Sequence, residues 1–148
     1  MATQKPIFIL NGPNLNLLGT REPEQYGNQT LADIEAECRV QADERGLAVD
    51  FRQSNHEGQL VDWLHEANET ACAVILNAGA LTHTSLALGD ALRGIHVPVV
   101  EVHISNVHAR EPVRHHSHIS APAAGIIVGF GTMGYGLAID AVARWNKT

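Results

Sequence analysis

Lysine and cysteine are scarce in this chain of 148 residues, and both scarcities narrow its chemistry. The two lysines, Lys5 and Lys147, lie near the chain ends, so a mechanism that needs a pocket lysine to form an imine has no obvious candidate. The two cysteines, Cys38 and Cys72, lie far apart, in a helix-like and a strand-like segment. We interpret them as reduced core thiols, with a disulfide or a nucleophile as the alternative.

Long apolar runs and an excess of positive charge are also missing. Although 45% of the residues are hydrophobic, no apolar run approaches the roughly 20 residues that span a membrane. The formal net charge of -6 argues against a general nucleic-acid binder, which would need a basic face. No signal peptide precedes the first apolar run, so we expect a cytoplasmic protein, and the length predicts one domain over residues 1–148.

Five short apolar runs alternate with segments of helical pattern. Several runs are continuously apolar, which is typical of strands covered on both faces. The alternation with short connections implies right-handed crossovers and a parallel sheet. We therefore predict an α/β fold, a flavodoxin-like doubly wound five-stranded parallel sheet with helices on both faces. The expected strands are Ile7–Leu10, Ala48–Arg52, Ala73–Asn77, Val97–Val102 and Ala124–Val128.

Four helices are expected between and after these strands. The first follows Thr30 as N-cap, with Asp33 complementing its start, and stops at Gly46. Two others run from about 57 to 70 and from about 84 to 93, and the last begins near 135. The side chains expected to face the core are Leu31, Ile34, Cys38, Val40, Leu60, Val61, Leu64, Ala67, Leu137, Ile139, Ala141, Val142 and Trp145.

Polar and ionisable side chains follow three of the expected strands. Open α/β sheets bind ligands at the carboxyl ends of their strands, so these side chains are expected to converge on one crevice. Their chemistry is that of a base, an acid, a cation and neutral hydrogen-bond donors, without an evident redox group. They are Asn11, Asn14, Asn16, Arg21 and Tyr26 after the first strand, Asn77 and His83 after the third, and Glu101, His103 and Ser105 at the fourth.

Tyr26 is a candidate general base because Arg21 lies five positions before it. With a pKa of about 10, ionising a tyrosine at pH 7 costs about 4 kcal/mol. A guanidinium about 4 Å away contributes about 4 kcal/mol at an effective dielectric constant of about 20. The alternative is a loop tyrosine packed on the surface beside a structural arginine. The loop from about 18 to 29 is long, as lids often are, and we expect it to close over a substrate.

His103 is a candidate acid because Glu101 and His103 alternate along a strand and point to the same side. A carboxylate bonded to one ring nitrogen fixes the tautomer and favours the charged ring, which can donate from its other nitrogen. The alternative is a histidine that caps the strand end. The backbone amides of Ile104 and Ser105 are suited to an anion such as a carboxylate.

Two further motifs invite functional interpretations. The histidine-rich stretch from 108 to 118 lacks a familiar metal-ligand spacing, so we favour Arg110 and Arg114 as cations for an anionic substrate, with solvated arginines as the alternative. The segment Gly129–Gly134 fits the dinucleotide fingerprint, but no strand follows it to supply a ribose ligand. We interpret it as a tight packing turn.

Together these motifs resemble the type II 3-dehydroquinate dehydratase family over essentially the whole chain. Two departures occur: Val113 stands where an aromatic residue is common and His118 where tyrosine is common. Both affect packing near Arg114 and remove no catalytic group. The matching segments are Asn11–Asn16, Gly19–Gly27, Asn77–Ala80, Thr82–Ser85, Glu101–Asn106, Arg110–Glu111 and Arg114–Ser117.

The resemblance implies dehydration of 3-dehydroquinate to 3-dehydroshikimate without a metal or organic cofactor. It implies that Tyr26 is the base, that Arg21 lowers its pKa, and that Asn14 holds a water against an enolate oxygen. It also implies that His103, oriented by Glu101, is the acid. The resemblance also implies a homododecamer built from trimers, in which Asp90 reaches the site of a neighbouring subunit. The positions that match substrate-binding residues are Asn77, His83, Asp90, Ile104, Ser105 and Arg114.

Two rival interpretations follow from the residues alone. The first is a non-catalytic flavodoxin-like module that binds a small anion or nucleotide in the same crevice. The second is a metal-dependent hydrolase that uses the histidine-rich stretch. The dehydratase needs an acid and a base that follow different strands. Of the two rivals, only the binding module would use the same crevice as the dehydratase.

Overall fold

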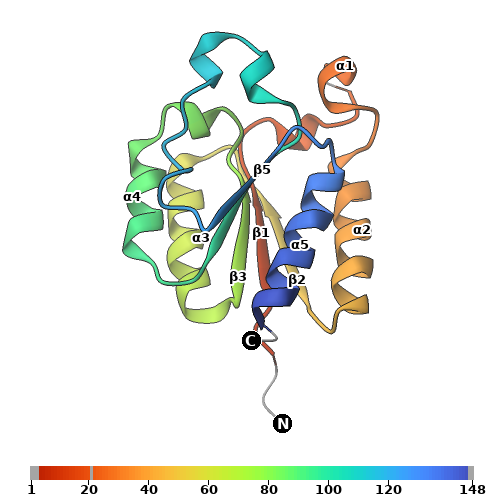
Figure 1. The fold of residues 1–148 in the computed structure, drawn as a ribbon, viewed down its shortest axis with the longest axis vertical. Helices are drawn as coiled ribbons and strands as arrows, with labels where there is room; N and C mark the ends of the chain where they lie inside the picture. The colour runs from red at the N-terminus through yellow and green to blue at the C-terminus, as the bar shows by residue number, and fades with distance from the viewer. Residues whose placement is uncertain (1–3, 21, 147–148) are drawn as a thin grey trace.

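The computed structural model describes residues 4–20 and 22–146, and its centre is a parallel five-stranded sheet (Figure 1). The strand order is β2-β1-β3-β4-β5, so the direction of winding reverses between β1 and β3. The predicted doubly wound, flavodoxin-like fold is therefore confirmed. The strands are β1 (Ile7–Asn11), β2 (Val49–Gln53), β3 (Ala73–Asn77), β4 (Val99–His103) and β5 (Gly125–Val128).

Helices cover both faces of the sheet. Figure 1 shows α3 and α4 on one side and α2 and α5 on the other. Short 3-10 turns follow β1, β3 and β4, at the edge where the strands end. The helices are α1 (Pro23–Tyr26), α2 (Leu31–Glu44), α3 (Glu57–Thr70), α4 (Leu86–Gly94) and α5 (Met133–Asn146), and the 3-10 turns are η1 (Leu15–Leu17), η2 (Gly79–His83), η3 (Val107–Ala109) and η4 (Pro112–Arg114).

The two helical layers bury alternate side chains of the interior strands. In β1, Ile7 and Ile9 join the core under α2 and α5, whereas Phe8 and Leu10 join the core under α3 and α4. Every residue of β1, β3 and β4 is buried, which explains why these strands are continuously apolar. The ends of these strands are consequently held in fixed positions.

The predicted start of α2 is confirmed. Thr30 Oγ1 accepts a hydrogen bond from the Asp33 N–H at 3.1 Å, and Asp33 Oδ2 accepts one from the Thr30 N–H at 3.0 Å. This reciprocal pair is a capping box. Cys38 is buried on α2 and Cys72 is partly buried before β3, and both are free thiols. Burial raises the pKa of Cys38 to about 12, so its thiol is a poor nucleophile.

Three side chains predicted to face the core are exposed instead. In α2 the buried positions are Ile34, Cys38 and Ala42, at a spacing of four, and Val40 lies on the opposite side with 61% of its surface exposed. Val40 therefore lies about half a turn away from the buried stripe of the helix.

The same correction applies to the last helix. It begins at Met133, two residues earlier than predicted, and Leu137 and Trp145 are exposed. The residues that face the core are Tyr135, Ala138, Ile139, Val142 and Ala143. Within the described residues, no helix is both long and apolar enough to cross a membrane.

Candidate active site

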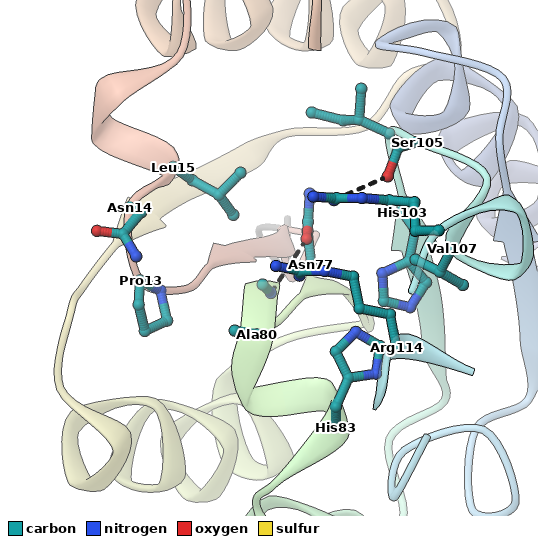
Figure 2. A pocket seen from close by; sticks show the side chains of 13 residues that line it. Pro13, Asn14, Leu15, Asn77, Ala80, His83, His103, Ser105, Val107 and Arg114 are labelled. Atoms are coloured by element: carbon teal, nitrogen blue, oxygen red, sulfur yellow. Dashed lines mark hydrogen bonds between the residues drawn. The ribbon is translucent and has the colours of Figure 1, made fainter. Parts of the chain in front are cut away.

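A cleft opens at the carboxyl ends of β1, β3 and β4, beside the point where the winding reverses (Figure 2). It encloses about 490 Å³, part of which is open to solvent. Figure 2 shows Asn14 and Leu15 on one wall, His103 and Ser105 on the other, and Asn77 between them. The lining residues are Pro13, Asn14, Leu15, Asn77, Gly79, Ala80, His83, His103, Ile104, Ser105, Val107, Arg110 and Arg114.

The wall that carries Asn14 is held against the loop after β3. The Gly12 N–H donates to the Asn77 carbonyl at 2.8 Å, and a Cβ at Gly12 would lie 2.4 Å from the Ala78 carbonyl oxygen. Only glycine allows this approach of two backbones. Asn14 has a positive φ of 70°, which asparagine tolerates, and its N–H donates to Asn55 Oδ1 at 3.0 Å.

The opposite wall contains a buried carboxylate and imidazole pair. His103 Nε2 is hydrogen-bonded to Glu101 Oε2, and 5% of His103 and 1% of Glu101 is exposed. The hydroxyl of Ser117 donates to the same carboxylate oxygen at 3.0 Å, and that of Ser120 donates to the other at 2.5 Å. The Nδ1 atom of His103 makes none of these bonds, so it is the nitrogen that can act on a ligand.

These hydrogen bonds keep Glu101 ionised. Burial alone would raise the pKa of this carboxyl, but the bonds from His103, Ser120 and Ser117 outweigh burial and lower the pKa below its usual range. A carboxylate that stays charged next to an imidazole fixes the ring's orientation and stabilises its protonated form. The pair thus fixes the ring and leaves Nδ1 as the ring nitrogen not bonded to Glu101.

His83 is arranged for the opposite task. Its Nδ1 lies 2.8 Å from the His116 carbonyl oxygen, which can only accept, so Nδ1 carries the proton. Burial is the main cause that lowers the pKa of His83, and it outweighs the bond to His116. The ring is therefore neutral at pH 7 and its Nε2 is a hydrogen-bond acceptor. The His83 and His103 rings are stacked, with centroids 6.3 Å apart.

Two arginines place positive charge on the cleft. Arg114 Nε donates to Glu111 Oε1 at 2.9 Å and keeps 22% of its side chain exposed. Arg110 is more buried, with 10% exposed, and its Nη1 lies 3.5 Å from Ser105 Oγ. The guanidinium groups suit an anionic ligand such as a carboxylate.

Most of the residues predicted for the site come together. Asn14, Asn77, His83, His103, Ile104, Ser105 and Arg114 line the cleft, and Glu101 lies directly behind His103. Asp90 does not reach this cleft, because it lies on the exposed face of α4 beside Arg93. Arg21 and the Tyr26 side chain lie outside the described residues, although Tyr26 is the last residue of α1.

Asn11 was expected in the crevice and is found elsewhere. It is the last residue of β1, is fully buried, and accepts a hydrogen bond from the Tyr135 hydroxyl at 2.6 Å. Tyr135 in turn accepts one from Asn77 Nδ2 at 3.0 Å. Sequence reasoning missed Tyr135 and Ser120, because both support a site residue from far along the chain and neither belongs to a recognisable local motif.

The glycine-rich segment is a packing turn, as predicted. The Gly129 N–H donates to the His103 carbonyl at 3.2 Å and the Gly131 N–H to the Ile104 carbonyl at 2.9 Å. Both glycines have positive φ, so the turn needs them. Across the described part of the chain, no group of three or more potential metal ligands is arranged around one point.

The fold and the cleft define a flavodoxin-like α/β protein whose site offers a proton donor, a neutral acceptor and cations to a small anion. The family model for class II dehydroquinases matches residues 5–143. The chain is 60% identical to the 3-dehydroquinate dehydratase of Acidovorax ebreus, over 95% of this chain and 99% of that protein. It is 56% identical to 3-dehydroquinate dehydratase 2 of Pseudomonas aeruginosa, over 95% of each.

Solved structures agree with the sequence comparison. The type II dehydroquinase from Propionibacterium acnes superposes with a TM-score of 0.92 at 42% identity, over 97% of this chain and 99% of that one. A 3-dehydroquinate dehydratase-like protein from Bifidobacterium longum superposes with a TM-score of 0.74 at 31% identity, over 98% of this chain and 100% of that one. The chain belongs to the class II dehydroquinase family, and its expected enzyme class, a hydro-lyase, is confirmed.

Proposed function

We propose that this protein dehydrates 3-dehydroquinate to 3-dehydroshikimate by an anti elimination through an enolate, without a metal or organic cofactor. The relatives' names support the substrate. The observation that carries the mechanism is the buried Glu101–His103 pair, which opens onto a cleft lined by amides and arginines.

His103 is the proposed acid. In the elimination, the carbon–oxygen bond to the leaving hydroxyl breaks while His103 Nδ1 gives its proton to that oxygen, and water departs. Glu101 stays ionised throughout and stabilises the charged ring before the transfer. The bonds from Ser117 and Ser120 hold Glu101 in place.

Tyr26 is the proposed base, with Arg21 stabilising its phenolate. It takes the proton from the carbon beside the ketone, and the electron pair moves onto the ketone oxygen to form the enolate. The motif around Tyr26 supports this role, and so does the state of the only other tyrosine in the sequence. Tyr135 is fully buried, and desolvation raises the pKa of its hydroxyl, so it stays protonated.

Neutral donors and cations hold the substrate in this proposal. Asn14 positions a water against the enolate oxygen, where a neutral donor stabilises developing charge. Asn77 and the acceptor Nε2 of His83 bind hydroxyl groups. The backbone amides of Ile104 and Ser105 and the guanidinium of Arg114 bind the carboxylate.

We also propose that the protein is a cytoplasmic homododecamer built from trimers, with no nucleic-acid or membrane partner. The exposure of Asp90, with 79% of its side chain accessible in one chain, is compatible with a contact to a neighbouring subunit's site. Leu86 on the same helix is 68% exposed. Light scattering that gives the mass of twelve chains would support the assembly, and a monomer mass would exclude it.

The decisive experiment is a dehydratase assay after treatment with borohydride. The protein is treated with borohydride in the presence of substrate, freed of reductant, and then assayed with fresh substrate. We expect absorbance from the conjugated enone product to rise at the same rate as in an untreated sample, because no lysine lines the described cleft and no imine forms. Inactivation by borohydride would exclude the enolate mechanism. Absence of any product would favour the non-catalytic anion-binding module.

Two variants test the assigned roles. Tyr26→Phe should abolish turnover while keeping binding of a substrate analogue within an order of magnitude, and comparable turnover would remove Tyr26 as the base. His103→Ala should also lose turnover, and near-normal turnover would reject it as the acid.

A further inference from the structure

A chain of four hydrogen bonds runs from the floor of the cleft into the core. The Gly79 N–H donates to Asn77 Oδ1 at 3.2 Å, and Asn77 Nδ2 donates to the Tyr135 hydroxyl at 3.0 Å. The Tyr135 hydroxyl donates to Asn11 Oδ1 at 2.6 Å, and Asn11 Nδ2 donates to the Arg52 carbonyl at 3.0 Å. The chain therefore links the loop after β3, helix α5, and strands β1 and β2.

The two ends of this chain fix its direction. A backbone N–H can only donate, so the atom of Asn77 that faces Gly79 is the oxygen and the atom that faces Tyr135 is the nitrogen. A backbone carbonyl can only accept, so Asn11 turns its nitrogen toward Arg52 and its oxygen toward Tyr135. Only a group that accepts from one side and donates to the other can join these two amides, and a hydroxyl does both.

We infer that Tyr135 is a positioning residue that holds the Asn77 amide in place for the substrate, in the orientation that the Gly79 N–H sets. Tyr135 does not line the cleft itself. With the phenol in place, Asn77 offers one remaining N–H and one remaining oxygen lone pair. Without it, the amide nitrogen loses its partner and the bond from the Gly79 N–H alone holds the group, so the amide can swing away from the position in which it meets the substrate.

The position of the phenol is itself determined by close packing. Tyr135 has 1% of its surface exposed. The preceding Gly134 has no side chain, and a Cβ there would lie 3.3 Å from Val102 Cγ1 and 3.4 Å from Ile127 Cγ2. Helix α5 therefore begins close to the sheet, and this closeness lets the phenol reach between Asn11 and Asn77.

Tyr135→Phe tests the inference, which rests on the proposed function for its kinetic readout. The variant keeps the ring that fills the core and removes only the hydroxyl. We expect KM for 3-dehydroquinate to rise about tenfold, which corresponds to about 1.4 kcal/mol of lost binding. We expect kcat to fall less, because His103 and Glu101 keep their contacts. A KM within twofold of wild type would overturn the inference.

Ile139→Val is the matched control. It removes one methylene from a fully buried residue of the same helix that has no place in the hydrogen-bonded chain. We expect it to lower Tm without changing KM. An equal rise of KM in both variants would mean that a softer core, rather than the lost hydroxyl, weakens binding, and would also overturn the inference.

Two further measurements keep the test decisive. If Tyr135→Phe does not fold, Asn11→Ser takes its place, because it removes the amide that anchors the phenol. This variant should also raise KM, and an unchanged KM would refute the role of the hydrogen-bonded chain. NMR of the Asn77 side-chain amide needs no turnover: the resonances of its two protons should shift in Tyr135→Phe toward those of a free asparagine amide, because the nitrogen has lost its partner. A wild-type protein without dehydratase activity would refute the proposed function, whereas unchanged amide resonances in Tyr135→Phe would refute the positioning role.

Discussion

Replacing Glu101 by glutamine should separate the charge of this side chain from its shape. Glutamine fills the same space, and its amide oxygen can keep the bonds from His103 and Ser117. Its nitrogen then faces Ser120, whose hydroxyl can rotate to accept instead of donate. The variant therefore loses mainly the negative charge.

The loss of charge determines how far the free energy of unfolding and kcat should fall. A hydrogen bond between neutral groups contributes about 1 kcal/mol net, and an ionised acceptor roughly doubles that value. Three such bonds meet at Glu101, so Glu101→Gln should lower the free energy of unfolding at pH 7 by about 3 kcal/mol. Because the charged His103 ring also loses its counterion, kcat should fall by about ten- to a hundredfold, within the usual contribution of a general acid.

The effect on stability should depend on pH in a defined direction. The pKa of Glu101 is lowered in the folded protein below its ordinary value of 4.5. Its stabilising contribution is therefore fully present above that value and is lost as pH falls through the folded-state pKa. Denaturant unfolding should show a wild-type-minus-variant difference that is constant from about pH 6 to 8 and shrinks below about pH 4.5.

The control is Glu69→Gln, which neutralises an exposed carboxylate on α3. It should leave both stability and kcat nearly unchanged. A difference between wild type and Glu101→Gln that grows on acidification would contradict the linkage. A variant with full stability at pH 7 would show that the charge of Glu101 is not needed.

Further predictions concern variants that raise or lower the free energy of unfolding and the protonation of one histidine. Thr82→Val should raise the free energy of unfolding by about 1 kcal/mol, because Thr82 Oγ1 is the buried side-chain atom without a hydrogen-bond partner among the residues described, and a lower Tm would refute this. Gly12→Ala should destabilise the protein by about 3 kcal/mol or more, because the added Cβ clashes with the Ala78 carbonyl. Gly58→Ala, in an open helical position, should stabilise it by about 0.5–1 kcal/mol. A change of Tm in the same direction in both variants would contradict this geometry. His83 should take up its proton below pH 6.5 in an NMR titration, and a midpoint above that value would contradict its burial.

The sequence predicted the sheet because the signals for its strands are local and strong. Runs such as Ile7–Leu10 and Ala73–Asn77 are continuously apolar, and such runs mark strands that are buried on both faces. The errors came at helix positions where an apolar residue lies off the buried stripe. Val40 and Trp145 are apolar but exposed, and one sequence does not reveal which apolar side chains a neighbouring layer will cover.

The candidate site was predictable to the extent that its residues follow strands directly. His103 and Glu101 share one strand, and their alternation alone places them on one side of it. Asn11 misled the same reasoning, since it is still inside β1 and faces the core instead of the cleft. A difference of one residue in the end of a strand decides whether an amide binds a ligand or supports the fold.

The groups that could not be predicted lie in the last third of the chain and act through others. Ser120 helps to hold the carboxylate that bonds His103, and Tyr135 holds the amide of Asn77. Neither the Ser120 contact nor the Tyr135 contact follows from spacing, because each closes a loop of at least 19 residues between partners that share no periodic pattern. Helix α5 consequently contributes no residue to the lining of the cleft and yet holds one of the cleft's amides in place. The hydrogen-bonding specificity of the cleft therefore depends on the packing of α5 against the sheet as well as on the loops that surround the ligand.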